Sequence, residues 1–345
     1  MGEISIPQSI ANSVDDFQGE GDQFLSLERL QQFQALRFGM FLHWGMSTFD
    51  GKELSSCEPL ETYQPLNIDV DQWIRVAAET GMQYAVLTVK HVSGHALWPS
   101  NYGEYSVKNS AVTTDVVAEF VAACKKYQIK PCFYYCAWDN TNLFGMKPTP
   151  DWATYSKGII HTNDAYREFM WAQINELLTL YGPIEMLWVD IPHVLPLDKK
   201  KELYAMVKSI DPNVIFAFNH SCQDGTQIDS TTFFPTDIMT MERTLPNHAA
   251  GHAKQSYYQW KEVDGGMYYI PGEYNDTIGR EWFYQEYDEP RDDLDLLAIV
   301  LGSTSRGVNC LLNVPPNKEG VLPEKWVSSL KRLRENLDKV GFFNQ

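Results

Sequence analysis

The chain has 345 residues, 44% of them hydrophobic, so it can bury a large core as one α/β barrel or as two medium-sized domains. Its formal net charge of −17 repels phosphate backbones and anionic lipids, which makes nucleic acids and membrane surfaces poor partners. We find no stretch of eighteen apolar residues in the sequence and therefore expect no membrane span.

The amino terminus, MGEISIPQSI, lacks the apolar core of a signal peptide. A Met-Gly start can also stand in place of a signal peptide that has been removed. We therefore expect a periplasmic or secreted protein whose signal peptide is removed, with a cytoplasmic location as the alternative.

Short apolar segments alternate with amphipathic segments along the chain, which is the pattern of alternating strands and helices. The expected strands cover residues 38–43, 84–91, 131–138, 185–190, 214–219, 238–242, 267–273 and 308–314. The expected helices cover residues 70–80, 114–127, 165–181, 199–210, 292–303 and 324–339.

Eight such strands predict an α/β fold with a parallel sheet and helices outside it, and closing that sheet gives a TIM-like (β/α)8 barrel. An open doubly wound sheet is the alternative, but no GxGxxG follows the first strand, which disfavours a nucleotide-binding version. We expect residues 1–30 to form an amino-terminal extension and residues 31–345 to form the barrel. Because the pattern ends with the helix that follows the eighth expected strand, we expect no carboxyl-terminal β-sandwich.

The functional residues of such a barrel lie at the carboxyl ends of its strands. Nearly every expected strand ends on a polar or aromatic side chain. These strand-end residues are His43, Trp44, His91, Trp138, Asp190, Asn219, His220, Glu242, Glu273 and Asn313. A single one is explained by a strand cap or a buried hydrogen bond, but so many on one rim predict a pocket at the barrel mouth.

Asp190 follows an apolar strand, where a carboxylate is costly to bury unless it is hydrogen-bonded. Glu242 and Glu273 end two later expected strands, and carboxylates that face each other across a barrel mouth are typical of glycoside hydrolysis. The alternative is a metal-dependent hydrolase whose ligands would be His43, His91, His220, Asp190 and Glu242. The first expected strand lacks a His-x-His pair, so we expect neither a metal nor another cofactor.

Five segments of the chain together resemble the α-L-fucosidases of glycoside hydrolase family 29. They are FGMFLHWG, YAVLTVKHVSGHALWPS, EMLWVD, DIMTME and GVNCLLNVPPNKEG, and they follow the family's order over residues 35–322. Each segment alone is a weak signal, whereas the set is specific. The resemblance implies a barrel enzyme with a retaining mechanism.

Under this resemblance Asp190 is the nucleophile, and the acid/base is Glu242 or Glu273. We favour Glu242 because it ends the DIMTME segment. The resemblance and the strand ends together predict these substrate-binding residues: His43, Trp44, Glu53, His91, Tyr135, Trp138, His220 and Trp282. Two departures stand out: the family's adjacent His-His pair reads His91-Val92 here, and His220 lies near the place of a family arginine.

We therefore expect a retaining glycoside hydrolase that works by double displacement. Its substrates would be oligosaccharides or glycoconjugates that carry terminal α-L-fucosyl residues or residues of a related L-sugar. Two alternatives stay open: a carbohydrate-binding protein of the same fold without activity, and the metal-dependent hydrolase. The high aromatic content, 13% of residues, suits flat sugar faces, although core packing alone also explains it.

Overall fold

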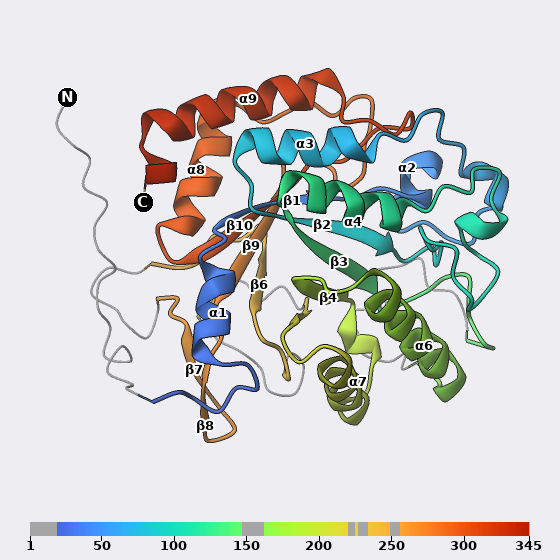
Figure 1. Ribbon diagram of the computed structural model, residues 1–345, viewed down its shortest axis with the longest axis horizontal. Coiled ribbons are helices and arrows are strands. Elements are labelled where there is room, and N and C mark those ends of the chain that lie inside the picture. Colours follow the sequence, from blue (N-terminus) through green and yellow to red (C-terminus); the bar gives the residue numbers. More distant parts are fainter. Residues whose placement is uncertain (1–18, 147–161, 220–224, 227–233, 249–255, 345) are drawn as a thin grey trace.

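A computed structural model describes residues 19–146, 162–219, 225–226, 234–248 and 256–344 of the chain (Figure 1). Within these residues, eight parallel strands form one sheet in the order β5-β4-β3-β2-β1-β10-β9-β6. They are β1 (Phe38–Leu42), β2 (Tyr84–Lys90), β3 (Lys130–Cys136), β4 (Met186–Asp190), β5 (Ile215–Phe218), β6 (Met239–Glu242), β9 (Gly272–Thr277) and β10 (Val308–Asn313). The sheet curls into a nearly closed barrel, as the alternating sequence pattern predicts.

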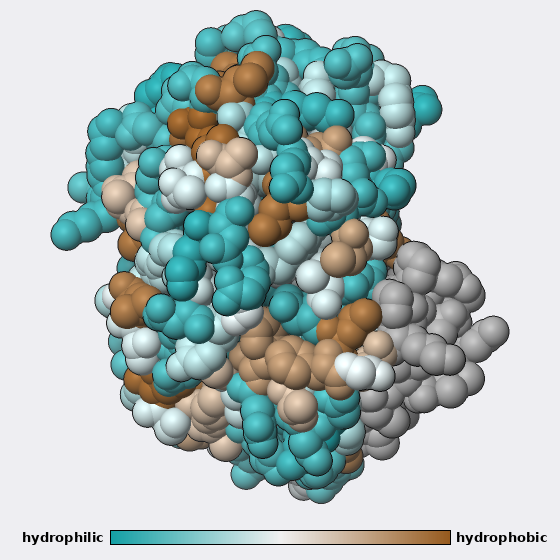
Figure 2. All heavy atoms as spheres, turned by 90° about the vertical axis from the view of Figure 1, so that its right-hand side faces the viewer, coloured by the Kyte–Doolittle hydropathy of each residue, from teal (hydrophilic) through white to brown (hydrophobic). Residues whose placement is uncertain are grey.

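Helices surround the strands in Figure 1. The described α-helices are α1 (Leu27–Gln34), α2 (Met46–Asp50), α3 (Val70–Thr80), α4 (Val116–Tyr127), α6 (Asp164–Tyr181), α7 (Leu197–Ile210), α8 (Asp293–Thr304) and α9 (Glu324–Lys339). Among the described residues, no helix is long and apolar enough to cross a membrane. The face drawn in Figure 2 is mostly hydrophilic with small separate hydrophobic patches, as expected for a strongly acidic chain.

Helix α3 shows how the sequence sets the bounds of these elements. The Asp69 carboxylate accepts a hydrogen bond from the backbone N–H of Gln72, which caps the first turn. Gly81, with a φ of 88°, ends the helix in the left-handed conformation that glycine adopts without strain. Between these caps, Trp73 and Ile74 are fully buried, so one face of the helix packs on the barrel.

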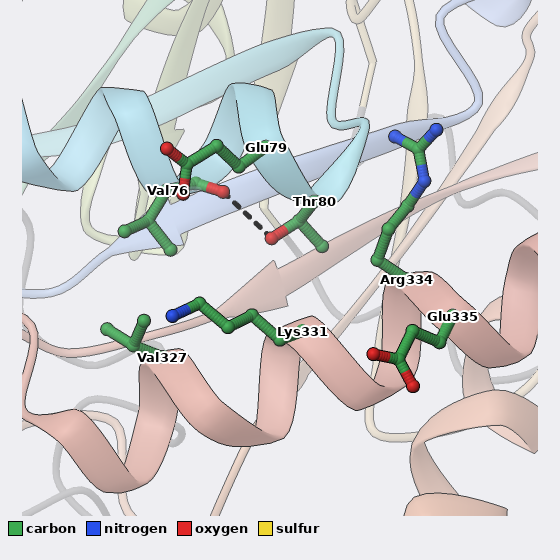
Figure 3. A pocket seen from close by; sticks show the side chains of 7 residues that line it. All are labelled: Val76, Glu79, Thr80, Val327, Lys331, Arg334 and Glu335. Carbon is green, nitrogen blue, oxygen red and sulfur yellow. Dashed lines mark hydrogen bonds between the residues drawn. The ribbon is translucent and has the colours of Figure 1, made fainter.

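A cavity of about 250 Å³ lies between α3 and α9 on the outside of the barrel (Figure 3). It is lined by Val76, Glu79, Thr80, Val327, Lys331, Arg334 and Glu335. Thr80 ends α3 shortly before the amino end of β2, and its hydroxyl donates to the Val76 carbonyl of its own helix at 2.8 Å. This cavity therefore lies away from the carboxyl ends of the strands.

The two end strands of the sheet, β5 and β6, meet at the seam where the barrel closes. Asp237, just before β6, links these two strands. Its N–H donates to the Phe216 carbonyl at 2.8 Å, and its carboxylate accepts from the Phe216 N–H at 2.7 Å. The same carboxylate pairs with Lys208 Nζ at 2.6 Å and accepts from the Tyr204 hydroxyl at 2.6 Å. Lys208 and Asp237 are both buried, so an ion pair ties helix α7 to the seam.

The position expected for the seventh strand, residues 267–273, is wrong. Gly266–Tyr269 (β8) instead pairs with Trp260–Val263 (β7) in an antiparallel hairpin outside the barrel sheet. Asp264 and Gly265 form its turn with φ angles of 49° and 84°. Positive φ at both positions is the signature of a type I′ turn, for which Asp-Gly is a favoured sequence. The hairpin uses the apolar residues that the pattern assigned to the barrel.

Strand β9 therefore begins later than expected, at Gly272. Glu273 is its second residue and pairs in register with Asn309 of β10. The carboxyl end of β9 is Thr277, which pairs with Asn313 at the end of β10. Glu273 thus lies at the amino end of its strand, and the expectation that it ends a strand is wrong.

Helix α1 crosses the boundary expected between an extension and the barrel at residue 30. Leu30 and Phe33 of this helix are fully buried. The Phe33 ring lies 5.8 Å from the Tyr84 ring at the start of β2, and the Phe33 carbonyl accepts from Asn309 Nδ2 at 2.9 Å. Helix α1 therefore packs against the amino end of the barrel and belongs with it.

Replacing Lys208 with Met removes the cation of the buried pair and leaves the Asp237 carboxylate partly uncompensated. We expect the free energy of unfolding, measured by urea denaturation, to fall by about 3 kcal/mol. The control is Lys199→Met on the same helix, because Lys199 pairs with Glu202 at 2.7 Å near the surface. That change should cost less than about 1 kcal/mol. Equal losses would show that the buried pair does not stabilise the seam.

Candidate active site

The carboxyl ends of β4, β5 and β6 bring three polar side chains together. Asp190 is the last residue of β4, Asn219 directly follows β5, and Glu242 is the last residue of β6. Parallel strands all end at the same edge of their sheet, so these groups share one rim of the barrel. Side chains alternate along a strand, and Trp188, two residues before Asp190, contacts rings from β1 and β3 inside the barrel. Asp190 therefore faces inward as well.

The Asp190 carboxylate is held by donors on both of its oxygens. The Tyr134 hydroxyl donates to Oδ2 at 2.6 Å, and Asn219 Nδ2 donates to Oδ1 at 2.9 Å. Burial raises the pKa of Asp190, while these two bonds and the Ile191 backbone N–H act to lower it. Burial and the charge of Asp190 raise the pKa of Tyr134 well above its usual value, so the phenol stays protonated and remains a donor.

Asn219 connects Asp190 to Glu242. Its Oδ1 accepts a hydrogen bond from the Thr240 hydroxyl at 2.8 Å, which turns the amide nitrogen toward the carboxylates. That nitrogen also approaches Glu242 Oε2 at 3.5 Å. Two oxygens that lie 2.9 Å and 3.5 Å from one nitrogen are at most about 6.4 Å apart, a limit that admits the separation of about 5–5.5 Å typical of retaining glycosidases.

His43 is a neutral side chain at the end of β1. Its Nδ1 lies 2.8 Å from Asn313 Oδ1, and Asn313 Nδ2 donates to the Trp282 carbonyl at 2.8 Å. Because the amide oxygen can only accept, Nδ1 carries the proton and Nε2 is left as an acceptor. Burial lowers the pKa of His43 to about 3, and the charge of Arg243 acts in the same direction.

Aromatic rings form a wall beside the carboxylates. Tyr134 stacks on Trp188 with ring centroids 5.3 Å apart and on His91 with centroids 5.5 Å apart. Burial lowers the pKa of His91 well below its usual value, and its Nδ1 has no hydrogen-bond partner among the described residues. The Trp282 ring lies 5.1 Å from the His43 ring. This wall offers flat apolar faces, and the His91 Nδ1 within it is buried and lacks a hydrogen-bond partner among the described residues.

Two charged side chains complete the rim. The Arg243 guanidinium lies 5.0 Å from the centre of the Trp282 ring, and its Nη2 donates to the Arg280 carbonyl at 2.8 Å. Burial raises the pKa of Glu53, and the negative charges of Glu242 and Asp190 raise it further, while Arg243 lowers it. The charges of these carboxylates therefore act on Glu53, although this residue is exposed to solvent.

This arrangement pairs two carboxylates with neutral hydrogen-bonding groups and aromatic faces. It can hold a sugar ring, place one carboxylate as a nucleophile and use the other to transfer protons. Among the described residues, no group of three or more His, Cys, Asp or Glu side chains is arranged to hold a metal ion.

Comparison with known proteins decides the family. A family model described as "Alpha-L-fucosidase" matches residues 51–341, which is more than half of the chain.

The chain belongs to the alpha-L-fucosidase family.

Two relatives carry the name of that family. Alpha-L-fucosidase 1 from Arabidopsis thaliana is 29% identical over 333 residues, which cover 91% of this chain and 62% of that protein. Putative alpha-L-fucosidase 1 from Oryza sativa subsp. japonica is 29% identical over 320 residues, with coverage of 88% and 57%. The chain thus spans less than two thirds of the length of either relative.

A solved structure supports the same fold. Alpha-L-fucosidase isoenzyme 1 from Paenibacillus thiaminolyticus superposes with a TM-score of 0.72 at 25% identity. The match covers 90% of this chain and 75% of that one. The barrel expected from the sequence is therefore confirmed, both by the strands of this chain and by its similarity to an alpha-L-fucosidase.

Two predicted aromatic residues of this family member lie outside the site. Trp44 is buried behind the barrel wall, where its ring packs 5.4 Å from Trp73 of α3. Tyr135 also faces outward, and its hydroxyl donates to Gln173 of α6 at 2.8 Å. Both predictions of a rim position are wrong. Neighbouring side chains on a strand point to opposite faces, so Tyr134 faces inward instead of Tyr135. Trp44 lies in the segment after β1, where its indole N–H donates to the Asn317 carbonyl at 3.0 Å.

Three other predicted residues have different outcomes. Glu273 lies at the amino end of β9, completely buried, and its Oε2 accepts from the Tyr84 hydroxyl at 2.8 Å. Trp138 is buried in the loop after β3, with its indole N–H bonded to Asn140 at 2.8 Å, and its contact with a substrate stays a prediction. His220 lies outside the described residues.

Two residues of the site, Tyr134 and Arg243, were missed from the sequence, and the role of a third, Asn219, was not recognised. Tyr134 was missed because the neighbouring Tyr135 was chosen. Asn219 was noted as a strand end, but only its contacts with Asp190 and Glu242 reveal its place in the site. Arg243 directly follows β6, and its position one residue beyond a strand-end glutamate was the available signal.

The neutral state of His43 predicts how stability depends on pH. The unfolded chain binds a proton on this imidazole below pH 6.5, while the folded protein binds it only near pH 3. Stability therefore falls as the pH drops from 6.5. We expect His43→Gln, which cannot titrate, to lose about 2 kcal/mol less unfolding free energy than the wild type between pH 7 and pH 5. Chemical denaturation at both pH values measures this difference. If the wild type and the variant lost the same unfolding free energy, His43 would take up a proton as readily in the folded protein as in the unfolded chain.

Proposed function

We propose that the chain is a retaining glycoside hydrolase that removes terminal α-L-fucosyl residues, or residues of a related L-sugar, from oligosaccharides or glycoconjugates. The observation that carries this proposal is the pair of carboxylates, Asp190 and Glu242, which contact the same Asn219 amide. Membership of the alpha-L-fucosidase family supports the choice of sugar. The names of the Arabidopsis and rice relatives point to the same glycone.

In the first step, the Asp190 carboxylate attacks the anomeric carbon and forms a glycosyl-enzyme ester. Glu242 donates a proton to the leaving oxygen as the glycosidic bond breaks. In the second step, Glu242 takes a proton from water, and that water attacks the same carbon and releases Asp190. The two inversions leave the sugar with its original anomeric configuration.

The surroundings of Asp190 suit a nucleophile. It must be ionised to attack, and the hydrogen bonds from Tyr134 and Asn219 oppose the tendency of burial to keep it protonated. These bonds also fix the direction of the carboxylate. Once the ester forms, one oxygen becomes a carbonyl that still accepts a hydrogen bond, so the donors can hold both states.

The glycone is recognised by neutral groups together with one carboxylate, Glu53. His43 and His91 accept hydrogen bonds from sugar hydroxyls through nitrogens that have no proton, because burial keeps both imidazoles neutral. Trp282 supplies an apolar face, and Glu53 accepts from hydroxyls at the open side of the site. We also propose a periplasmic or secreted location, where glycan substrates of this kind occur.

Replacing Asp190 with Asn should remove nearly all turnover of 4-nitrophenyl α-L-fucoside, with a loss of about 10⁴-fold or more in kcat. The amide cannot attack. Its size is nearly unchanged, but its single oxygen can accept from only one of the two donors, Tyr134 or Asn219. Circular dichroism should show the wild-type fold. A panel of aryl α-L-glycosides tests the glycone, and added chelator should leave the rate unchanged. Wild-type rates in Asp190→Asn would rule out this mechanism.

Replacing Glu242 with Ala tests the acid/base. Its loss should slow substrates with poor leaving groups by about 10²–10⁴-fold, because these need protonation, and should slow activated aryl fucosides far less. Azide should then restore the second step and yield the α-fucosyl azide. If Glu242→Ala slowed substrates with good and poor leaving groups equally, and if azide did not raise its rate, another residue would be the acid/base.

A further inference from the structure

Arg243 directly follows Glu242 in the chain and has no step in the proposed reaction. Its backbone N–H donates to the Asn275 carbonyl at 2.9 Å, so pairing with β9 continues as far as this residue. Its φ angle of 53° lies in the left-handed region, which is strained for a residue other than glycine. Backbone strain of this kind is common at functional sites, so this residue is a candidate for a role in the site.

The left-handed conformation changes the direction of the Arg243 side chain. Side chains alternate along a regular strand, so the residue after Glu242 would point away from the barrel mouth if the strand continued. Instead, the Arg243 guanidinium lies 5.0 Å from the centre of the Trp282 ring, and that ring lies 5.1 Å from the His43 ring. Glu242 faces the site through its approach to Asn219. Glu242 and Arg243 therefore both lie on the rim of the site.

The Arg243 guanidinium has more donors than the protein uses. It carries five N–H groups, and among the described residues we find one hydrogen bond from it, from Nη2 to the Arg280 carbonyl at 2.8 Å. Asp276 Oδ1 lies 4.0 Å from Nε, but Arg291 Nη2 holds the same oxygen more closely, at 2.6 Å. The Arg243 side chain is 42% exposed, so a ligand at the rim can reach its remaining donors.

A retaining glycosidase holds its leaving group beside the acid/base. The acid must reach the oxygen that joins the leaving group to the fucosyl residue, so the atoms beyond that oxygen lie close to Glu242. In a glycan these atoms belong to a second sugar, whose hydroxyl and ring oxygens accept hydrogen bonds. Arg243 offers N–H donors on the rim next to Glu242.

We propose, building on the function proposed above, that Arg243 is a specificity residue that binds oxygen atoms of the first sugar of the leaving group. Its planar guanidinium presents N–H groups in a fixed fork, which can contact two neighbouring oxygens at once. The Arg280 carbonyl and the Trp282 ring hold the guanidinium in place. Arg243 therefore favours glycans over aryl leaving groups.

The other charges of the rim favour a neutral leaving-group sugar. Asp190, Glu242 and Glu53 are carboxyl groups, and their negative charges act at the same place as the positive charge of Arg243. Three carboxyl groups outnumber one guanidinium, so the rim does not attract a sugar that carries a carboxylate or a sulfate. Arg243 thus acts as a hydrogen-bond donor to sugar oxygens.

Two substrates that both need protonation separate this role from an effect on the acid/base. Phenyl α-L-fucoside has a poor leaving group without sugar oxygens. The second substrate is the neutral fucosyl disaccharide that the wild type cleaves best from a panel that differs in linkage. Arg243→Met should lower kcat/KM on this disaccharide about 10- to 100-fold, because a hydrogen bond from a charged donor is lost. On phenyl α-L-fucoside, kcat/KM should stay within about threefold.

Equal losses on the two substrates would overturn the proposal, because the change would then act through Glu242 or Trp282. The matched control is Arg280→Met, which removes an equal charge from the same rim. The Arg280 residue is exposed, and the backbone carbonyl that binds Arg243 is kept. This variant should keep both values of kcat/KM within about threefold. If it lowered the disaccharide value as much as Arg243→Met does, charge alone would explain the effect and the proposal would be wrong.

The aryl substrate also keeps the two proposals distinguishable. If the wild type hydrolyses phenyl α-L-fucoside but none of the disaccharides, the fucosidase activity stands and the role of Arg243 is wrong. If the wild type hydrolyses no aryl L-glycoside and no disaccharide, the proposed function itself is wrong, and the role of Arg243 is rejected with it. A loss confined to the disaccharide in Arg243→Met is the result that supports both proposals.

Discussion

The burial of one carboxylate, Asp190, is the constraint on which the rest of the site depends. Removed from water, this group tends to take up a proton, and a protonated Asp190 is no nucleophile. Donors from other strands must replace the lost water. Tyr134 and Asn219 do so, one on each oxygen, and the backbone N–H of Ile191 adds a further bond. The same bonds that keep the charge also fix its direction.

A parallel barrel satisfies this constraint because every strand delivers one side chain to the same rim. Tyr134 comes from β3 and Asn219 from the end of β5, while Thr240 of β6 fixes the Asn219 amide. The amide then faces two carboxylates at once, which limits the distance between them. The barrel in turn depends on its seam, where Asp237 links β5 to β6.

The barrel was predictable from the sequence because most of its strands are largely apolar and most of them are followed by a helix. The clearest exception is β9, whose inward side chains Glu273, Asn275 and Thr277 are polar, so the more apolar segment of β8 before it was the stronger signal. For the site, the sequence predicted which residues lie at the ends of most strands, but not which side chains point into the barrel. A shift of one position moves a side chain to the other face, which is why Tyr135 was chosen in place of Tyr134. The bridging role of Asn219 depends on contacts between strands that no local pattern encodes.

The measurement that tests the central claim most directly is chemical trapping of the nucleophile. A 2-deoxy-2-fluoro-α-L-fucosyl fluoride reacts quickly in the first step and slowly in the second, so the ester accumulates. Mass spectrometry of the digested protein should find one fluorofucosyl group, attached to the peptide that contains Asp190, and none after Asp190→Asn. A label on any other carboxylate, or a glycone product with inverted configuration and no label, would contradict the account.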